Sequence, residues 1–246
     1  MVGGTYKTEA VVLRSIRFSE ADRILHVYTL ERGRVGAIAK GVRKTKSRFG
    51  ARLEPLSHVE LMLHEGSGEL QTVTGASLIR SHHTAREDTF RLEIGLIGAE
   101  AMLRLFAEPE ANAKAFTALT RFLDALDEAP VPASGRAALH PLVLSFQLKL
   151  LWVSGYLPHV TSCVECGAGA LVGFSARAGG AVCAEHAQGS LVLSPEGLAG
   201  IEGLLSAPLA DAPAIELGDR ARREALGVVT SSYEEHGGFR LRTLSA

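Results

Sequence analysis

Along the first 80 residues, hydrophobic and polar positions follow the short alternations that are typical of β-strands. Residues 8–16 and 23–30 are rich in β-branched and aromatic side chains, and residues 33–40 follow a Glu-Arg-Gly turn as the return strand of a hairpin. Loose alternation over 59–64 and an apolar run over 70–74 add two more strands. Five short strands with strongly turning connections predict a small closed β-barrel rather than an open sheet.

After the predicted barrel, the hydrophobic period changes to steps of three and four residues, which predicts helices. The first helical face is formed by Phe90, Ile94, Ile97, Ala101 and Leu105. Similar patterns recur over 115–126 and 137–153. Ser194 and Pro195 are suited to begin a further helix as its N-cap and its first helical residue, and residues 220–233 can form the last one.

A candidate metal site lies between these helices. Cys163-Val-Glu-Cys166 and Cys183-Ala-Glu-His186 are separated by 16 residues and contain all three cysteines of the chain. Two close-spaced ligand pairs joined by a short loop are suited to tetrahedral Zn²⁺, and Gly167 allows the backbone to turn beneath the metal. Four protein ligands predict one structural zinc ion per chain; the alternative is three buried thiols that never meet.

Because helices are predicted on both sides of the metal segment, we expect that segment to be an insertion in a helical domain. The predicted fold class is α+β with several domains: an N-terminal five-stranded OB-fold β-barrel, then an α-helical domain carrying an inserted zinc finger. The expected divisions are residues 1–80 for the barrel, 81–160 for the first helical part, 161–190 for the zinc finger and 191–246 for the C-terminal helical part.

The charges are unevenly distributed, although the chain as a whole has a net charge of −1. Residues 1–80 contain 13 Lys and Arg against 8 Asp and Glu, and residues 32–52 contain eight basic residues and no acidic one. This asymmetry predicts a phosphate-binding surface on the barrel, with a solvated basic loop as the alternative. The predicted contacts are Arg34, Lys40, Arg43, Lys44, Lys46 and Arg48, with Arg14, Arg17 and Arg23 as nearby candidates.

Two features near this surface have less definite interpretations. For Phe49 the sequence allows two alternatives, stacking on a nucleic-acid base or packing against the barrel. The adjacent pair His82-His83 is expected to lie on a loop, because neighbouring side chains project in different directions.

Several classes of function are disfavoured by the motifs of the sequence. It contains no Walker-type phosphate loop, no G-x-S-x-G elbow, no H-E-x-x-H pair and no correctly spaced zinc-deaminase signature. The most apolar segment, residues 142–153, is interrupted by Gln147 and Lys149 and is too short to span a bilayer. The N-terminus lacks the pattern of a secretion signal, so a cytoplasmic protein is expected.

Short motifs in a distinctive order cover nearly the whole chain. The N-terminal ones are Glu20-Ala-Asp22-Arg23-Ile-Leu, Thr29-Leu-Glu-Arg-Gly33, Ala39-Lys40-Gly41-Val-Arg43-Lys44-Thr-Lys46-Ser47-Arg48-Phe-Gly, Leu53-Glu-Pro55-Leu-Ser and Gly68-Glu69-Leu70. The later ones are Gly155-Tyr-Leu-Pro158-His, Cys163-Val-Glu-Cys166-Gly, Phe174-Ser, Gly179-Gly180-Ala-Val-Cys183, Tyr233-Glu-Glu-His and Leu241-Arg-Thr-Leu. Together they resemble the bacterial RecO family of recombination mediators. The stretch from Lys40 to Arg48 is the most specific part of the resemblance.

The resemblance implies a non-enzymatic protein of DNA repair and homologous recombination, associated with the nucleoid during repair. Members of the family bind single- and double-stranded DNA, anneal complementary strands and act with RecR. Together with RecR they help RecA to displace single-strand-binding protein (SSB) from gapped DNA, and no membrane is involved. The zinc fingers of the family usually have four cysteines, and here His186 replaces the last one; imidazole is an ordinary zinc ligand.

Two alternatives belong to other classes. An OB barrel can serve RNA as well as DNA, so an RNA-binding or translation-associated protein with a zinc module is the second reading. A zinc-dependent hydrolase is the third, and it is disfavoured because four candidate ligands leave no open position for water.

Overall fold

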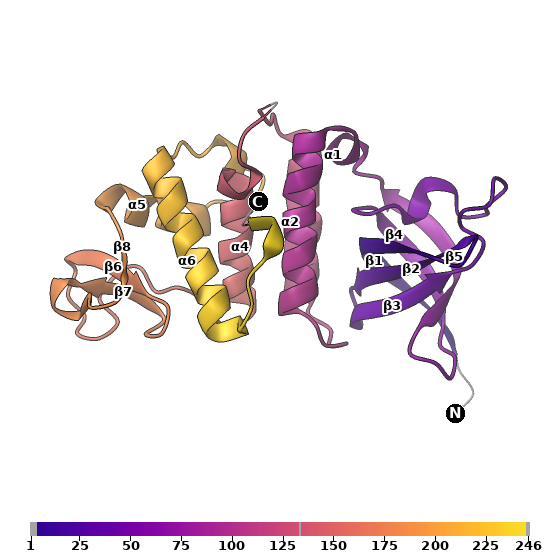
Figure 1. The fold of residues 1–246 in the computed structure, drawn as a ribbon, viewed down its shortest axis with the longest axis horizontal. Coiled ribbons are helices and arrows are strands. Elements are labelled where there is room, and N and C mark those ends of the chain that lie inside the picture. The colour runs from indigo at the N-terminus through magenta and orange to yellow at the C-terminus, as the bar shows by residue number, and fades with distance from the viewer. Residues whose placement is uncertain (1–3, 133, 245–246) are drawn as a thin grey trace.

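The first five strands close into a barrel in the order β1-β2-β3-β5-β4. The structure is a computed structural model, and it describes residues 4–132 and 134–244 (Figure 1). The strands are β1 (Thr5–Phe18), β2 (Asp22–Thr29), β3 (Gly33–Ala39), β4 (His58–His64) and β5 (Gln71–Arg80). Neighbouring strands are antiparallel except β3 and β5, which run parallel. The predicted five-stranded barrel of OB type is confirmed.

Strand β5 is longer than the apolar run over 70–74 indicates. Its second half pairs with the beginning of β4, from Ala76 opposite Leu61 to Arg80 opposite His58. Leu78 and Ile79 in this half are exposed, so burial does not impose the alternation by which strands are recognised in a sequence.

The two faces of the strands pack against different cores. Inward side chains such as Val12, Leu25 and Val27 fill the barrel, whereas Val11 and Tyr28 point outward and join the core of the helices. The β2–β3 turn also meets the helical part closely, because a Cβ on Gly33 would clash with the carbonyl oxygen of Glu110. Glycine, at a φ of +62°, therefore fits this turn for both space and backbone conformation.

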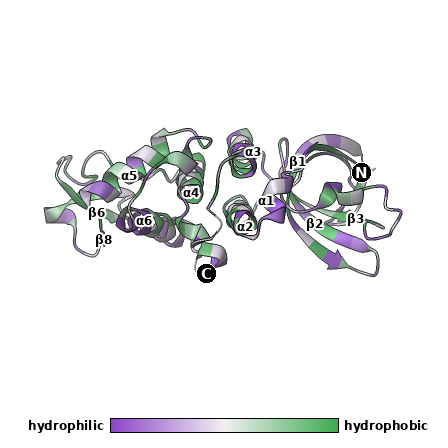
Figure 2. Ribbon diagram, turned by 90° about the horizontal axis from the view of Figure 1, so that it is seen from above, coloured by the Kyte–Doolittle hydropathy of each residue, from purple (hydrophilic) through white to green (hydrophobic). Residues whose placement is uncertain are grey.

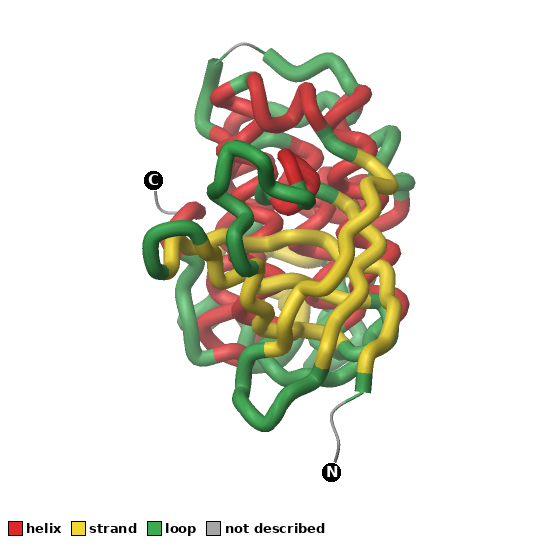
Figure 3. The backbone as a smooth tube through the Cα atoms, turned by 90° about the vertical axis from the view of Figure 1, so that its right-hand side faces the viewer, coloured by secondary structure: helices red, strands yellow, loops and turns green. Residues whose placement is uncertain are grey.

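The helical part lies beside the outer face of the barrel. Its helices are α1 (His83–Glu87), α2 (Thr89–Leu105), α3 (Ala113–Glu128), α4 (Pro141–Val153), α5 (Pro195–Ser206) and α6 (Asp219–Gly237). Figure 2 shows α2 and α3 next to the barrel, with α4, α5 and α6 farther away. Figure 3 views the molecule from the barrel side, where the strands lie in front of the helices. Among the described residues, no helix combines the length and the apolar character needed to cross a bilayer.

Local sequence explains where the helices begin. The side chains of Asp88, Asn112 and Ser194 accept hydrogen bonds from backbone N–H groups in the first turns of α2, α3 and α5. Helix α5 thus begins at the predicted Ser-Pro pair. The first eight residues of α4 are all buried, which makes it the central helix of this part.

The expectation that His82 and His83 both lie on a loop is wrong for His83, which is the first residue of α1. His82 lies on the loop that precedes this helix. This residue is buried at the junction between barrel and helices, where Nδ1 donates to the carbonyl oxygen of Leu56 (2.8 Å) and Nε2 lies 3.0 Å from Oδ1 of Asp124. Its burial results from the packing of the barrel against the helices, which a local pattern does not reveal. His83 is exposed on the first turn of α1.

A small sheet is inserted between α4 and α5. Strands β6 (Leu171–Ser175), β7 (Gly180–Cys183) and β8 (Leu191–Val192) are ordered β7-β6-β8, at the end of the molecule opposite the barrel (Figure 1). Phe174 and Leu193 join the main hydrophobic core and attach this sheet to the helices.

Candidate metal centre and nucleic-acid interface

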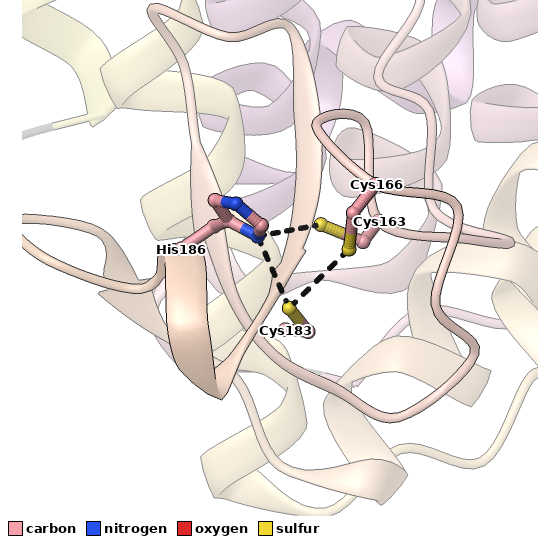
Figure 4. Close-up of side chains that lie close together, drawn as sticks. All are labelled: Cys163, Cys166, Cys183 and His186. Carbon is pink, nitrogen blue, oxygen red and sulfur yellow. Dashed lines mark hydrogen bonds between the residues drawn. The ribbon is translucent and has the colours of Figure 1, made fainter.

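Four side chains that were predicted as zinc ligands converge at the inserted sheet (Figure 4). The donor atoms of Cys163, Cys166, Cys183 and His186 all lie within 4.8 Å of one another. Nδ1 of His186 is 3.3 Å from Sγ of Cys183 and 3.7 Å from Sγ of Cys163, and the sulfurs of Cys166 and Cys183 are 3.7 Å apart. Ligands at zinc-bond distance in a tetrahedron are about 3.5–3.8 Å apart. The group could therefore hold a tetrahedral metal ion.

Local backbone geometry brings the ligands together. After the first pair, Gly167 turns the chain at a φ of +78°, as predicted, and its N–H donates to the carbonyl oxygen of Cys163 (2.8 Å). Cys183 ends β7, and a single 3₁₀ turn, Ala184–His186, then carries the imidazole to the sulfurs. The buried hydrophobic cluster of this segment contains only Cys163, Val182 and Cys183. The segment therefore has little core of its own.

The surroundings of Cys163 and Cys183 favour thiolate, the form of cysteine that binds metals. Burial raises the pKa of Cys163, but hydrogen bonds from the backbone N–H groups of Cys183, Cys166 and Glu165 outweigh it and lower this pKa to about 6. The hydrogen bond with His186 lowers the pKa of Cys183. For Cys166, the backbone hydrogen bond from Ala168 lowers the pKa, but the hydrogen bond with Cys163 and burial outweigh it and raise the pKa. These soft sulfur donors and one imidazole form a donor set suited to zinc.

A buried carboxylate connects the inserted sheet to α6. Oε2 of Glu224 accepts hydrogen bonds from the backbone N–H (2.9 Å) and the hydroxyl (2.8 Å) of Ser194, and Oε1 accepts one from Nε of Arg220 (2.7 Å). Burial raises the pKa of Glu224, but these hydrogen bonds outweigh it and hold the pKa below its ordinary value. The bonds to Ser194 fix the point where β8 continues into α5.

We expect Glu224→Gln to lower the free energy of unfolding at pH 7 by about 1–3 kcal/mol, because an amide cannot replace the ionised acceptor. A lowered folded-state pKa means that the carboxylate stabilises the fold above its unfolded pKa of about 4.3 and loses this effect as the pH falls through the folded value. The difference in melting temperature between wild type and variant should therefore shrink below about pH 4.3. Exposed Glu235→Gln is the control, and parallel pH curves for wild type and Glu224→Gln would contradict this role.

The second candidate site is the outer face of β1, β2 and β3. A bulge at Leu13 shifts the register of β1, so that Val11 lies opposite Tyr28 and Arg14 lies opposite His26 on the same face. Arg34 of β3 lies opposite Tyr28 of β2, and Lys40 directly follows the end of β3. Arg14 and Arg34, two of the predicted contacts, therefore share this face with the partly buried His26.

Apolar side chains on the same face were missed by the charge argument. Ile16, Ile24 and Ile38 form one row across the three strands, and Phe18, which is 47% exposed, lies beyond Ile16. The signal that could have found them is the strand register, since these residues alternate with inward-facing ones. Exposed apolar side chains among cations are suited to contact nucleic-acid bases.

The basic loop after β3 is fixed at both ends and exposed between them. At one end, the N–H of Gly41 donates to Oδ1 of Asp22 (2.7 Å) and Nη1 of Arg43 donates to the carbonyl oxygen of Glu20 (2.9 Å). At the other end, Phe49 is 1% exposed in the barrel core, and the guanidinium of Arg48 lies over its ring. Of the two readings, Phe49 therefore packs against the barrel. The exposed cations of this loop are Lys40, Arg43, Lys44, Lys46 and Arg48.

Two predicted residues lie apart from this surface. Arg17 of β1 and Arg23 of β2 lie opposite each other in the strand register near the β1–β2 turn, on the other face of the strands from Arg14. Nη1 of Arg23 forms an ion pair with Glu54 (3.1 Å), so its charge is already partly compensated.

Comparison with known proteins assigns both halves of the chain to one family. The family described as Recombination protein O N terminal matches residues 1–82, and Recombination protein O C terminal matches residues 86–245. The chain is 37% identical over 235 residues to the DNA repair protein RecO of Rubrobacter xylanophilus, covering 93% of this chain and 90% of the relative. It is 39% identical over 251 residues to that of Frankia casuarinae, covering 97% and 96%. The chain therefore belongs to the RecO family of DNA repair proteins.

Proposed function

We propose that this chain is a non-enzymatic mediator of DNA repair and homologous recombination that binds single- and double-stranded DNA and anneals complementary strands. The observation that carries the proposal is the exposed basic loop beside the outer face of an OB-type barrel, in a chain of the RecO family. Annealing requires both complementary strands to be accepted, so the protein has to neutralise phosphates without reading bases. Exposed lysines and arginines beside an apolar row meet this requirement.

The proposed partners follow from the family. The chain would act with RecR to load RecA on DNA coated by SSB, in the cytoplasm at the nucleoid. The working divisions are residues 1–80 for DNA binding, 81–160 and 191–246 for the helical platform and 161–190 for the zinc finger. Basic charge concentrated in the first 80 residues would leave the more acidic remainder available to partner proteins.

We also propose that Cys163, Cys166, Cys183 and His186 hold one structural Zn²⁺ per chain. The size of the donor group and its soft sulfur ligands support zinc, and four protein ligands close the coordination shell. The metal would supply stability rather than chemistry, since the segment around it has little hydrophobic core.

Charge reversal in the basic loop tests the DNA surface. Each phosphate of single-stranded DNA that a variant no longer neutralises reduces the slope of log K against log salt by about 0.7, so Lys44→Glu with Lys46→Glu should reduce it by about 1.4. Affinity should fall alike for different base sequences, because phosphates carry no sequence information. Fluorescence anisotropy with labelled homopolymers, measured across a salt series, gives both quantities.

The matched control reverses two exposed cations away from the barrel, Arg177→Glu with Arg223→Glu, and should leave the slope unchanged. An unchanged slope for the Lys44 and Lys46 variant would move the DNA site elsewhere. Competition with structured RNA decides between DNA and RNA as the ligand. If RNA displaced single-stranded DNA at much lower concentration than unlabelled DNA did, the RNA-binding reading would replace the proposal.

A further inference from the structure

A groove of about 920 Å³ lies between the barrel and the helical part. The barrel contributes Arg14, His26 and Arg34, and α2 contributes Arg104. The segment after α6 contributes Arg242. These residues come from parts of the chain that are far apart in sequence, so only the folded molecule brings the four arginines to one groove.

Among the described residues, the four arginines of the groove form no ion pairs, a property that they share with other arginines such as Arg177 and Arg223. Within residues 4–132 and 134–244, no ion pair involves Arg14, Arg34, Arg104 or Arg242, whereas Arg32 and Arg80 are paired with carboxylates. Cations that converge on one groove without forming ion pairs provide a site for an anionic ligand.

Among the described residues that line the groove, the one carboxylate is Glu100, and its oxygens are already used. They accept hydrogen bonds from the backbone N–H groups of Arg242 (3.1 Å) and Thr243 (2.9 Å) and from the hydroxyl of Thr243 (2.6 Å). Burial raises the pKa of Glu100, but these bonds and the charge of Arg104 outweigh it and lower the pKa. Glu100 thus holds the C-terminal segment against α2 and positions Arg242 beside the groove.

The barrel wall of the groove has a positive potential of its own. The pKa of His26 is lowered, first by burial and then by the charges of Arg34 and Arg14. The guanidinium groups of Arg14 on β1 and Arg34 on β3 therefore both act on the surroundings of His26. A phosphate bound there would relieve the repulsion between these two charges.

Strand β3 connects the groove to the basic loop. Arg34 lies on β3 and Lys40 directly follows the strand, six residues further on, so at about 3.3 Å per residue they are separated by roughly 20 Å. Ile38 lies between them on the face that carries Arg34, in the apolar row with Ile16 and Ile24. A spaced series of cations beside apolar side chains fits a single strand of nucleic acid, whose phosphates repeat and whose bases are exposed. A compact anion would occupy one end alone.

We propose that single-stranded DNA bound on the barrel continues into this groove, where Arg104 and Arg242 of the helical part contact its phosphates. The inference rests on the proposed function and adds the helical part to the DNA interface. It also gives the docking of barrel and helices a role in binding, since neither wall alone holds all four arginines.

The test replaces the two arginines of the helical part by Arg104→Glu with Arg242→Glu. Both side chains are exposed, so melting temperature should change little. With two fewer phosphates neutralised, the slope of log K against log salt for single-stranded DNA should decrease by about 1.4. Between about 50 and 200 mM salt, the loss of affinity should therefore be roughly sevenfold smaller for the variant than for the wild type. Arg104→Gln with Arg242→Gln should give the same change without adding negative charge.

The outcomes separate this inference from the proposed function. If the Lys44 and Lys46 variant changes the slope of log K against log salt and the Arg104 and Arg242 variants do not, the proposal that DNA enters the groove is overturned. The proposed DNA-binding function would then stand. If the wild-type protein itself does not bind single-stranded DNA, both are overturned. A variant that combines both charge-reversal pairs should reduce the slope of log K against log salt by about 2.8. That result would support a single DNA path from the basic loop into the groove.

Discussion

Protein purified without chelator is expected to contain one zinc ion per chain, and Cys166→Ala is expected to lose it and to unfold the inserted sheet. The sulfur of Cys166 lies 3.7 Å from that of Cys183, and the hydrophobic cluster around the ligands is too small to hold the segment without a metal. Because Phe174 and Leu193 connect the sheet to the main core, the damage should reach α5 and α6. We expect a decrease of more than about 4 kcal/mol in the free energy of unfolding, or insolubility.

Elemental analysis and thermal unfolding of the full chain measure the two effects. His186→Cys is the matched control, since it keeps four ligands and should retain one zinc ion, whereas His186→Ala should lose the metal and stability together. Wild-type protein without zinc but with high stability would contradict the metal centre. So would Cys166→Ala protein that keeps both its zinc and its melting temperature.

Local patterns in the sequence were sufficient where the structure is itself local. The two residue pairs of the candidate metal group were recognisable because each is set by a short turn, and the start of α5 was predicted because Ser194 and Pro195 act within one helical turn. The barrel was predicted from the number of strands and turns. The ligand pairs and the helix start are decided by residues close together in the chain, and so are the hairpins of the barrel, whereas its closure pairs Thr5 of β1 with the distant His64 of β4.

Features that depend on long-range packing were not predictable in the same way. The bulge at Leu13 puts Arg14 on the face that carries Arg34, while Arg17 and Arg23 lie on the other face, and charge counting cannot distinguish these cases. His82 lies on a loop, as expected, but its burial was not foreseen, because Leu56 and Asp124, which hold it, are 26 and 42 residues away. The groove arginines Arg104 and Arg242 lie outside the basic half of the sequence, so they were not considered as DNA contacts.

The central claim is that this chain brings complementary strands together without consuming nucleotide. The sequence contains no Walker-type phosphate loop, and the four donors of the candidate metal group would together fill a tetrahedral shell without leaving a position for a reacting water. The basic surface of the barrel supports annealing, because a strand held by its phosphates keeps the Watson–Crick edges of its bases available for pairing. The Lys44→Glu, Lys46→Glu variant should be defective in annealing to the extent that it is defective in DNA binding.

The most direct measurement is the annealing rate of complementary strands coated with SSB, followed by fluorescence energy transfer between labelled ends at low salt. We predict that the wild-type full chain accelerates annealing to the same extent with and without ATP, that added RecR changes the rate, and that rising salt suppresses it. A wild-type protein that fails to accelerate annealing at low salt, with or without ATP, would contradict the proposed mechanism, although membership of the RecO family would remain.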